Sequence, residues 1–258
     1  MSLPDPMPPF RWTPTPWGHA LVCDALPAST RHVFTARGLD VPHPEAGAGW
    51  ARLAEHLGVA EADVWRLHQV HGVTAHTDGV ARSRECWPEG DLLATDRTDV
   101  AVSVRTADCV PLLYADERTG VVAAVHAGWR GTVAGAAARM VAILATRFGT
   151  NPADLVVALG PSIGPEAYEV GHEVVEAFGR AWPEDAARGT WWRSAAEPGK
   201  YLLDLWTATR DQLAAAGVRP EHMHLAGLCT ATHADVFESF RVNGAAAGRM
   251  AAAIRRVR

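Results

Sequence analysis

Residues 100–132 read VAVSVRTADCVPLLYADERTGVVAAVHAGWRGT, and this stretch decides the fold class. It holds three short apolar runs rich in β-branched residues, Val100–Val104, Val110–Tyr114 and Val121–Val125. Runs of this length and composition predict buried β-strands. In the segment that follows, Thr132–Phe148, apolar residues recur at three- and four-residue spacing, which predicts a helix with one apolar face.

Outside this stretch the chain continues to alternate between strand-like and helix-like segments. Strands and helices in this mixed order predict an α/β (α+β) sandwich with mixed strand order. The C-terminal segment AAAGRMAAAIRRVR is ambiguous, because its alanines favour a helix while Gly248 interrupts one. The further expected strands are His32–Thr35, Val64–Leu67 and Leu155–Leu159, and the further expected helices are Trp50–Leu57, Glu173–Trp182 and Leu205–Ala216.

The chain of 258 residues shows no internal repeat and no long Gly/Ser or Pro linker between its structured segments. We therefore expect a single domain. The proline-rich start, residues 1–18, is expected to form a loose N-terminal arm, and residues 19–258 are expected to form one catalytic domain.

Composition and charge exclude several classes of protein. With 24 Lys+Arg against 29 Asp+Glu, the net charge of −5 argues against a nucleic-acid partner. The apolar runs are too short to span a bilayer, and the start lacks the apolar core of a secretory signal, so we expect a cytoplasmic protein with no membrane partner. Four cysteines are too few for a disulfide scaffold, which leaves metal binding or catalysis as the use of a cysteine.

Three residues at or near strand ends could together hold a metal ion: His71, Cys109 and His126. Two imidazoles and one thiolate form the three-ligand set of a catalytic zinc site, which keeps a fourth position open. The separations of 38 and 17 residues match no short zinc motif, however. From spacing alone, a buried cysteine with two ordinary histidines near turns is the favoured interpretation.

The neighbours of these residues suggest supporting roles. Gln69 alternates with His71 and could face the same pocket, whereas Asp108 is expected to orient a neighbouring group or to cap a turn. Arg130, in a glycine-flanked turn before a helix, could contact an anion or be solvated. Cys229 could lie near the site or simply be buried, and Cys23 and Cys86 have no assigned role.

A Cys–His hydrolase is the main alternative from chemistry alone. Cys109 with His126 as base would satisfy the logic of an activated nucleophile, with Asp108 or Gln69 orienting the base. Metal binding and nucleophilic catalysis require the same thiolate, so residue chemistry does not separate the two.

Five ordered motifs resemble a known family. LHQVHG (67–72), TADCVPLLYAD (106–116), AVHAGWRGT (124–132), LGPSIGPEAYEVG (159–171) and the terminal CT…FESFR…GR are similar to the YfiH/DUF152 family, also called the laccase-domain or multicopper polyphenol oxidase family. The match runs from about residue 20 to the C-terminus. It implies a single-domain α/β/β/α sandwich and a metal, zinc or alternatively copper, held by His71, Cys109 and His126.

The resemblance also implies purine nucleoside chemistry: phosphorolysis of adenosine, inosine and methylthioadenosine, together with adenosine deamination. The implied partners are a purine nucleoside and phosphate. By this resemblance Arg37, in the FTARG segment, is the first candidate for binding phosphate and Arg241 is the second. Gln69 is a candidate for contacting substrate or metal-bound water. The oligomeric state is not indicated.

Two other activities attached to the family are alternatives. Editing of peptidoglycan precursors is one, and it would suit the Cys–His hydrolase interpretation. A copper polyphenol oxidase is the other, and it is disfavoured because a laccase needs several copper sites with His-rich pairs for the additional ions.

The sequence departs from the family pattern at the expected substrate walls. Arg37 is followed by Gly-Leu-Asp instead of a pair of glycines, Ala167 stands where relatives often have cysteine, and the paired arginines near the end are reduced to Arg241-Val242. None of these departures touches the three metal ligands.

Overall fold

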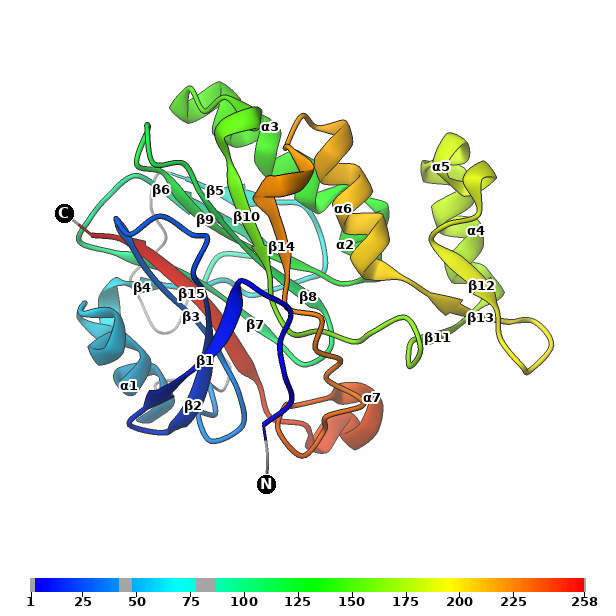
Figure 1. Ribbon diagram of the computed structural model, residues 1–258, viewed down its shortest axis with the longest axis horizontal. Coiled ribbons are helices and arrows are strands. Elements are labelled where there is room, and N and C mark those ends of the chain that lie inside the picture. Colours follow the sequence, from blue (N-terminus) through cyan, green and yellow to red (C-terminus); the bar gives the residue numbers. More distant parts are fainter. Residues whose placement is uncertain (1–2, 42–47, 78–86, 258) are drawn as a thin grey trace.

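Two mixed six-stranded sheets lie face to face at the centre of the molecule (Figure 1). The structure is a computed structural model that describes residues 3–41, 48–77 and 87–257. The first sheet has the strand order β1-β2-β3-β15-β7-β4. Its strands are β1 (Phe10–Thr15), β2 (Gly18–Cys23), β3 (Thr30–Thr35), β4 (Val64–Trp65), β7 (Ala101–Thr106) and β15 (Met250–Arg256).

The second sheet contains the two strands that follow β7 in the chain. Its order is β14-β10-β8-β9-β6-β5. The hairpin of β8 and β9 lies at its centre, because both strands are apolar on both faces and every residue of each is buried. Its strands are β5 (Ala75–His76), β6 (Leu92–Thr95), β8 (Val110–Ala115), β9 (Val122–Ala127), β10 (Val156–Leu159) and β14 (Met223–Leu225).

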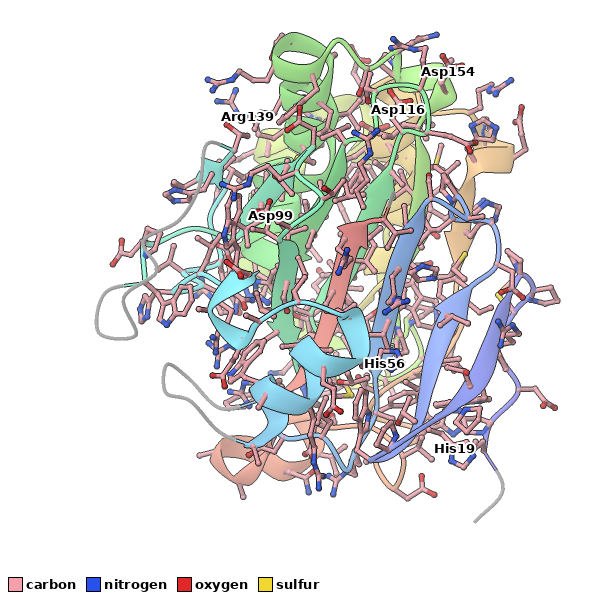
Figure 2. The ribbon with its side chains drawn as sticks, turned by 90° about the vertical axis from the view of Figure 1, so that its left-hand side faces the viewer. His19, His56, Asp99, Asp116, Arg139 and Asp154 are labelled. Carbon is pink, nitrogen blue, oxygen red and sulfur yellow. The ribbon has the colours of Figure 1, made fainter. Side chains whose placement is uncertain are left out.

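Helices cover the outer face of each sheet and so complete four layers. Trp50, Leu53 and Leu57 of α1 (Ala48–Leu57) pack on the first sheet, and Figure 2 shows this helix lying across its strands. The longer α3 (Ala136–Phe148) and α6 (Leu205–Ala215) pack on the second sheet. A further core fills the space between the sheets. The α/β/β/α sandwich with mixed sheets is confirmed.

A smaller unit lies beside the second sheet. It is a three-stranded sheet of order β11-β13-β12 with two helices (Figure 1). The remaining elements are β11 (Glu169–Gly171), β12 (Trp192–Ser194), β13 (Lys200–Leu203), α2 (Trp129–Val133), α4 (His172–Ala181), α5 (Pro183–Arg188), α7 (Phe240–Asn243) and 3-10 turns at Glu61–Asp63, Pro152–Asp154, Pro220–His222 and Gly244–Ala246.

Two sequence-based expectations about local structure are wrong. The single helix expected over Thr132–Phe148 is interrupted, because Gly135 adopts a left-handed conformation (φ 76°) between α2 and α3. The proline-rich start is not loose either. Residues Phe10–Thr15 form β1, which pairs along its whole length with β2 across the proposed boundary at residue 18.

The ambiguous C-terminal segment forms a strand in the middle of the first sheet. β15 pairs with β3 on one side and with β7 on the other. Its alanines lie in two cores, with Ala252 between the sheets and Ala251 and Ala253 under α1. Burial on both faces therefore overrides the helix propensity of alanine.

Gly160 lies where the two sheets approach each other, and we predict that it tolerates no side chain. A Cβ atom there would lie 2.2 Å from Cδ1 and 2.5 Å from Cε1 of Phe34 in β3. We expect Gly160→Ala to lower the free energy of unfolding by about 1–3 kcal/mol, the usual cost of overpacking a core. The matched control is Gly179→Ala in α4, where no atom lies within 4 Å of the added Cβ. Urea denaturation measures both variants, and equal stabilities would contradict the prediction.

His32 gives the fold an acid-sensitive contact. The backbone N–H of Cys23 donates to its Nε2 (2.9 Å), while its Nδ1 is buried without a partner among the described residues. Burial lowers the pKa of His32 from 6.5 to about 4.

Between pH 6.5 and pH 4, His32 is therefore protonated in the unfolded chain but largely neutral in the folded chain. The free energy of unfolding consequently falls as the pH drops from 6.5 to 4. We expect the loss of Tm over this window to be smaller in His32→Gln, whose amide oxygen can accept the same hydrogen bond without titrating. Thermal unfolding of both proteins from pH 7.5 to pH 4 measures the difference, and parallel curves would refute the role of His32.

Candidate metal centre

Two loops and the end of one strand bring the expected metal ligands together at one end of the sheets. His71 lies in the loop after β4, Cys109 in the turn between β7 and β8, and His126 near the end of β9. One nitrogen of each histidine and the Sγ of Cys109 lie within 4.8 Å of one another. The two imidazole rings are 4.9 Å apart between centroids and inclined by 70°. Among the described residues, this is the one group of three or more His, Cys, Asp or Glu side chains that could hold a metal ion.

A buried carboxylate that the sequence interpretation missed organises these loops. Asp91, just before β6, accepts hydrogen bonds from the backbone N–H groups of Val70 (3.2 Å), His71 (3.0 Å) and Gly72 (2.7 Å). It also accepts one from Nδ1 of His126 (2.8 Å). An Nδ1–H held by a carboxylate leaves Nε2 of His126 as the free ligand atom. The signal in the sequence is slight: a lone acidic residue between Gly90 and an apolar strand.

A strained turn places Cys109. Asp108 has a φ of 100°, which is rare for a residue with a side chain. Its carboxylate accepts hydrogen bonds from Oγ1 of Thr230 (2.6 Å) and from the backbone N–H of Arg241 (2.7 Å). Both partners of the Asp108 carboxylate come from the C-terminal part of the chain.

Gly128 keeps the space beside the thiol open. A Cβ atom at this position would lie 2.7 Å from Sγ of Cys109 and 3.0 Å from Cδ2 of His71. Only glycine therefore permits the backbone after β9 to approach the ligand group this closely.

Electrostatics favour a thiolate at Cys109. Burial alone raises its pKa, but the charge of His126 and the hydrogen bonds from His126 and His71 lower the pKa to about 6. Burial lowers the pKa of His126, but Cys109 and Asp91 raise it to about 9. Burial likewise opposes ionisation of Asp91, yet its hydrogen bonds hold its pKa below the usual value. A thiolate next to two imidazole nitrogens is a donor set suited to zinc or copper.

The ligand group opens into a cavity of about 460 Å³. This volume lies within the range of sites for small molecules. Beside the three ligands, the cavity is lined by the aromatic residues Trp129, Tyr168 and Phe240, the arginines Arg105, Arg130, Arg241 and Arg249, and the residues Gln69, Thr106, Ala107 and Asp108.

Gln69 and Arg241 thus lie at the cavity, as the sequence suggests, but both side chains also bind backbone. The amide of Gln69 pairs with Arg105 in both directions: Nε2 donates to its carbonyl and Oε1 accepts from its N–H, each at 2.8 Å. Arg241 donates from Nη1 to the carbonyl of Glu169 (2.8 Å) and lies 5.1 Å from the ring centroid of Tyr168.

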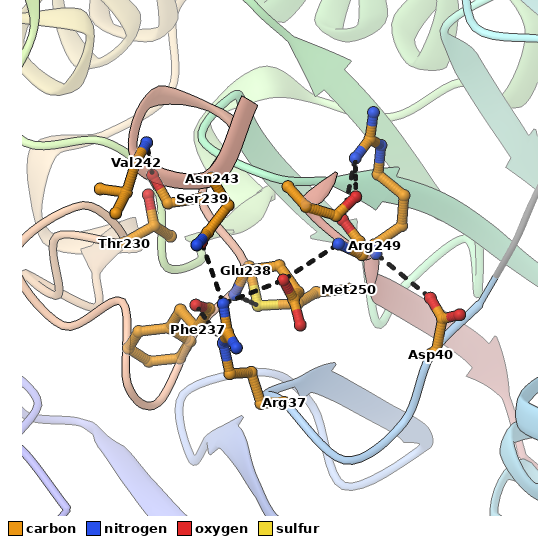
Figure 3. A network of polar contacts seen from close by, with 12 residues as sticks. Arg37, Asp40, Thr230, Phe237, Glu238, Ser239, Val242, Asn243, Arg249 and Met250 are labelled. Carbon is orange, nitrogen blue, oxygen red and sulfur yellow. Dashed lines mark hydrogen bonds and ion pairs between the residues drawn. The ribbon is translucent and has the colours of Figure 1, made fainter. Parts of the chain in front are cut away.

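Arg37 is not brought to this cavity (Figure 3). Its guanidinium donates to the carbonyl of Phe237 (2.9 Å) and to Oδ1 of Asn243 (3.0 Å), and it forms an ion pair with Glu238 (3.2 Å). These partners neutralise its charge and tie the segment after β3 to the C-terminal segment. The expectation that Arg37 binds phosphate beside the metal ligands is therefore replaced by a structural role.

The other cysteines lie outside the ligand group. Cys23 is buried in β2, and burial raises the pKa of its thiol to about 11. Sγ of Cys229 accepts a hydrogen bond from the backbone N–H of Gly164 (3.2 Å) and does not line the cavity. Cys86 lies outside the described residues. The His-x-His pair of His222 and His224 also belongs to no ligand group of the described chain.

The fold and the site together define a class: an α/β/β/α sandwich with one candidate three-ligand metal centre in an arginine-lined cavity. The chain belongs to the family described as multi-copper polyphenol oxidoreductase laccase, whose model matches residues 45–257. No helix among the described residues combines the length and apolarity needed to cross a membrane.

Several bacterial relatives of this chain are named purine nucleoside phosphorylase. A purine nucleoside phosphorylase of Deinococcus radiodurans is 42% identical over 216 residues, covering 83% of this chain and 78% of the relative. The purine nucleoside phosphorylase YlmD of Geobacillus stearothermophilus is 37% identical over 212 residues, covering 80% and 76%. A purine nucleoside phosphorylase of Bacteroides thetaiotaomicron is 41% identical over 167 residues, which is 64% of this chain and 60% of the relative.

Solved structures agree with the fold. The crystal structure of YlmD from Geobacillus stearothermophilus superposes with a TM-score of 0.83 at 32% identity, over 93% of this chain and 96% of that one. A hypothetical protein YfiH from Bacillus licheniformis gives 0.86 at 27% identity, over 97% and 100%. The family that the sequence motifs indicate is confirmed.

We predict that Asp91 controls metal affinity through His126 and the loop of His71. Asp91→Asn keeps the shape but removes the charge and one acceptor, so we expect zinc affinity to fall about 10- to 100-fold. Competition with a chromophoric chelator measures the affinity. Asp99→Asn, at an exposed carboxylate paired with Arg97 (Figure 2), is the control and should bind zinc like the parent. An unchanged affinity in Asp91→Asn would show that the carboxylate does not act on the metal.

Proposed function

We propose that this protein is a cytoplasmic, zinc-dependent purine nucleoside phosphorylase acting on adenosine, inosine and methylthioadenosine, with adenosine deaminase activity. The observation that carries the proposal is one cavity that joins a His-Cys-His ligand group, aromatic walls and four arginines. The names of the relatives from Deinococcus radiodurans and Geobacillus stearothermophilus support the phosphorolysis of purine nucleosides.

The aromatic walls suit a nucleoside. Phe240 is 54% exposed at the cavity, which is unusual for a large apolar side chain and provides a surface on which a purine ring can stack. Tyr168 lies across the same cavity. Burial, reinforced by the charge of Cys109, raises the pKa of Tyr168, so its hydroxyl stays protonated and can donate a hydrogen bond to the substrate.

The arginines suit the second substrate. In phosphorolysis an oxygen of hydrogen phosphate bonds to the anomeric carbon as the bond from that carbon to the purine nitrogen breaks. The proton of hydrogen phosphate passes to the departing base, so the products are the free base and ribose 1-phosphate. Guanidinium groups hold the phosphate dianion by paired hydrogen bonds and orient its oxygen.

Deamination would use the ligand group. His71, Cys109 and His126 are the residues that would hold the ion, and Asp91 fixes the orientation of His126. When bound, zinc supplies Lewis acidity that makes water a nucleophile near neutral pH. Water then replaces the amino group of adenosine, giving inosine and ammonia.

A Cys–His hydrolase is the second candidate, because the thiol of Cys109 has a pKa of about 6 and His126 a pKa of about 9. Such a pair is also a nucleophile with its base. Polyphenol oxidation with several coppers is less well supported, since the described residues offer one ligand group rather than several.

The decisive experiment incubates the protein with adenosine, with and without phosphate, and separates the products by chromatography. We expect adenine and ribose 1-phosphate only with phosphate, and inosine in both cases. Both activities should be lost on chelation and return with zinc or, if copper is the native metal, with copper. Cys109→Ala should lose bound metal and both activities, whereas Cys23→Ala, at a thiol away from the cavity, should retain them.

Two outcomes would contradict the proposal. One is the absence of turnover of any purine nucleoside by fully metallated protein. The other is an activity that survives exhaustive chelation but is abolished by alkylation of Cys109, which would establish the Cys–His hydrolase.

A further inference from the structure

The guanidinium of Arg105 lines the cavity without a hydrogen-bond or ion-pair partner in the described part of the chain. Arg105 lies near the end of β7, is partly buried and lines the cavity. Within the described part of the chain, its side chain forms no hydrogen bond and no ion pair. Burial of a cation without a partner costs free energy. An unpaired, partly buried guanidinium at a cavity therefore indicates that an anion binds there.

The backbone of Arg105 is held unusually firmly. On one side β7 pairs with β15, where Arg105 lies opposite Ala251. On the other side the amide of Gln69 binds its N–H and its carbonyl, each at 2.8 Å. Two side-chain hydrogen bonds thus replace a neighbouring strand. They fix the base of the Arg105 side chain while leaving its five N–H donors unused by protein.

The surroundings of Arg105 are positive. Burial, together with the charges of Arg249 and Arg66, lowers the pKa of Arg105 to about 10, against a smaller opposing effect of Asp40. Asp40 is itself engaged by the backbone N–H of Arg249 (3.3 Å, Figure 3). The charges that act on Arg105 are therefore mainly cationic, and the carboxylate of Asp108 in the same cavity is bound by Thr230 and the backbone of Arg241.

The other arginines of the cavity already have partners. Arg241 binds the carbonyl of Glu169, and Nη1 of Arg249 binds the carbonyls of Ala247 (2.8 Å) and Gly248 (2.9 Å). Arg130 lies 4.2 Å from the ring centroid of Trp129 and is exposed. Arg105 is thus the group best prepared to bind an anion through both of its terminal nitrogens.

We propose that Arg105, assisted by Arg249, is the binding site for the phosphate dianion, with Gln69 as its positioning residue. The assignment rests on the proposed phosphorolysis for its physiological meaning. It replaces Arg37, whose guanidinium is neutralised by Glu238. A phosphoryl group on a nucleotide shares the chemistry of inorganic phosphate, and the experiment separates the two.

The kinetic test compares Arg105→Gln and Arg105→Lys with the parent enzyme. Loss of a paired, charge-assisted contact should raise the KM for phosphate by about 10- to 100-fold in Arg105→Gln. Arg105→Lys keeps the charge but lacks the planar fork, so its KM should lie between the two. Deamination of adenosine needs no phosphate, so Arg105→Gln should lower the kcat/KM of phosphorolysis much more than that of deamination. The matched control is Arg139→Gln, at an exposed arginine of α3 that also has no partner among the described residues.

A binding test without nucleoside keeps this inference separable from the proposed activity. Calorimetric titration with inorganic phosphate should detect binding to the metal-loaded parent and to Arg139→Gln, and at least tenfold weaker binding to Arg105→Gln. A parallel titration with AMP tests whether the bound phosphoryl group belongs to a nucleotide. If free phosphate is the ligand, phosphate must bind without a nucleoside attached.

The outcomes are distinct. If nucleosides are not turned over but phosphate binding depends on Arg105, the proposed function fails and the anion site stands. If the parent does not bind phosphate, or if Arg105→Gln and Arg105→Lys bind it like the parent, the assignment is overturned. The same holds if only AMP binds, or if Arg105→Gln impairs deamination as strongly as phosphorolysis.

Discussion

The carboxylate of Asp91 is the constraint on which the site depends. It is fully buried and accepts hydrogen bonds from three consecutive backbone N–H groups around His71 and from the ring of His126. These partners lie about 20 residues before it and 35 after it in the chain. A single ionised group therefore sets the position of one ligand and the orientation of another. Removing it would leave buried donors unpaired, which costs more than the loss of one contact.

The C-terminal part of the chain closes the other side of the site. Thr230 and the backbone of Arg241 hold the strained turn at Asp108, and β15 lies between β3 and β7 in the first sheet. The ion pair of Arg37 with Glu238 connects the same segment to the N-terminal strands. The candidate metal ligands lie between residues 71 and 126, but the turn that carries one of them is held by residues from the C-terminal part of the chain. The ligand loops and the two termini are thus coupled parts of one structure.

The sequence alone predicts those features of the protein that depend on residues close together in the chain. The apolar runs between Val100 and Val125 identify the central strands, and motif resemblance points to the three candidate ligands that the structure brings together, because both depend on residues close together in the chain. Asp91 and Arg105 escape prediction, since their importance comes from partners 20 to 36 residues away or from a partner that is missing. The strand at Met250–Arg256 escapes it for a related reason. Only packing between two layers explains why an alanine-rich segment is extended there.

The net charge of −5 argues against a polyanionic partner but does not describe the cavity, because a small anion responds to the charges within a few ångströms of it. Locally the balance differs: the charges of Arg249 and Arg66 lower the pKa of Arg105, and Asp40 opposes them only in part. The thiolate and imidazoles of the ligand group form a separate electrostatic environment. In adenosine, the purine ring system separates the carbon that carries the amino group from the anomeric carbon. Under the proposed function, the two reactions would therefore use different polar groups of the cavity: the ligand group would serve the attack of water, and the arginines would serve the attack of phosphate.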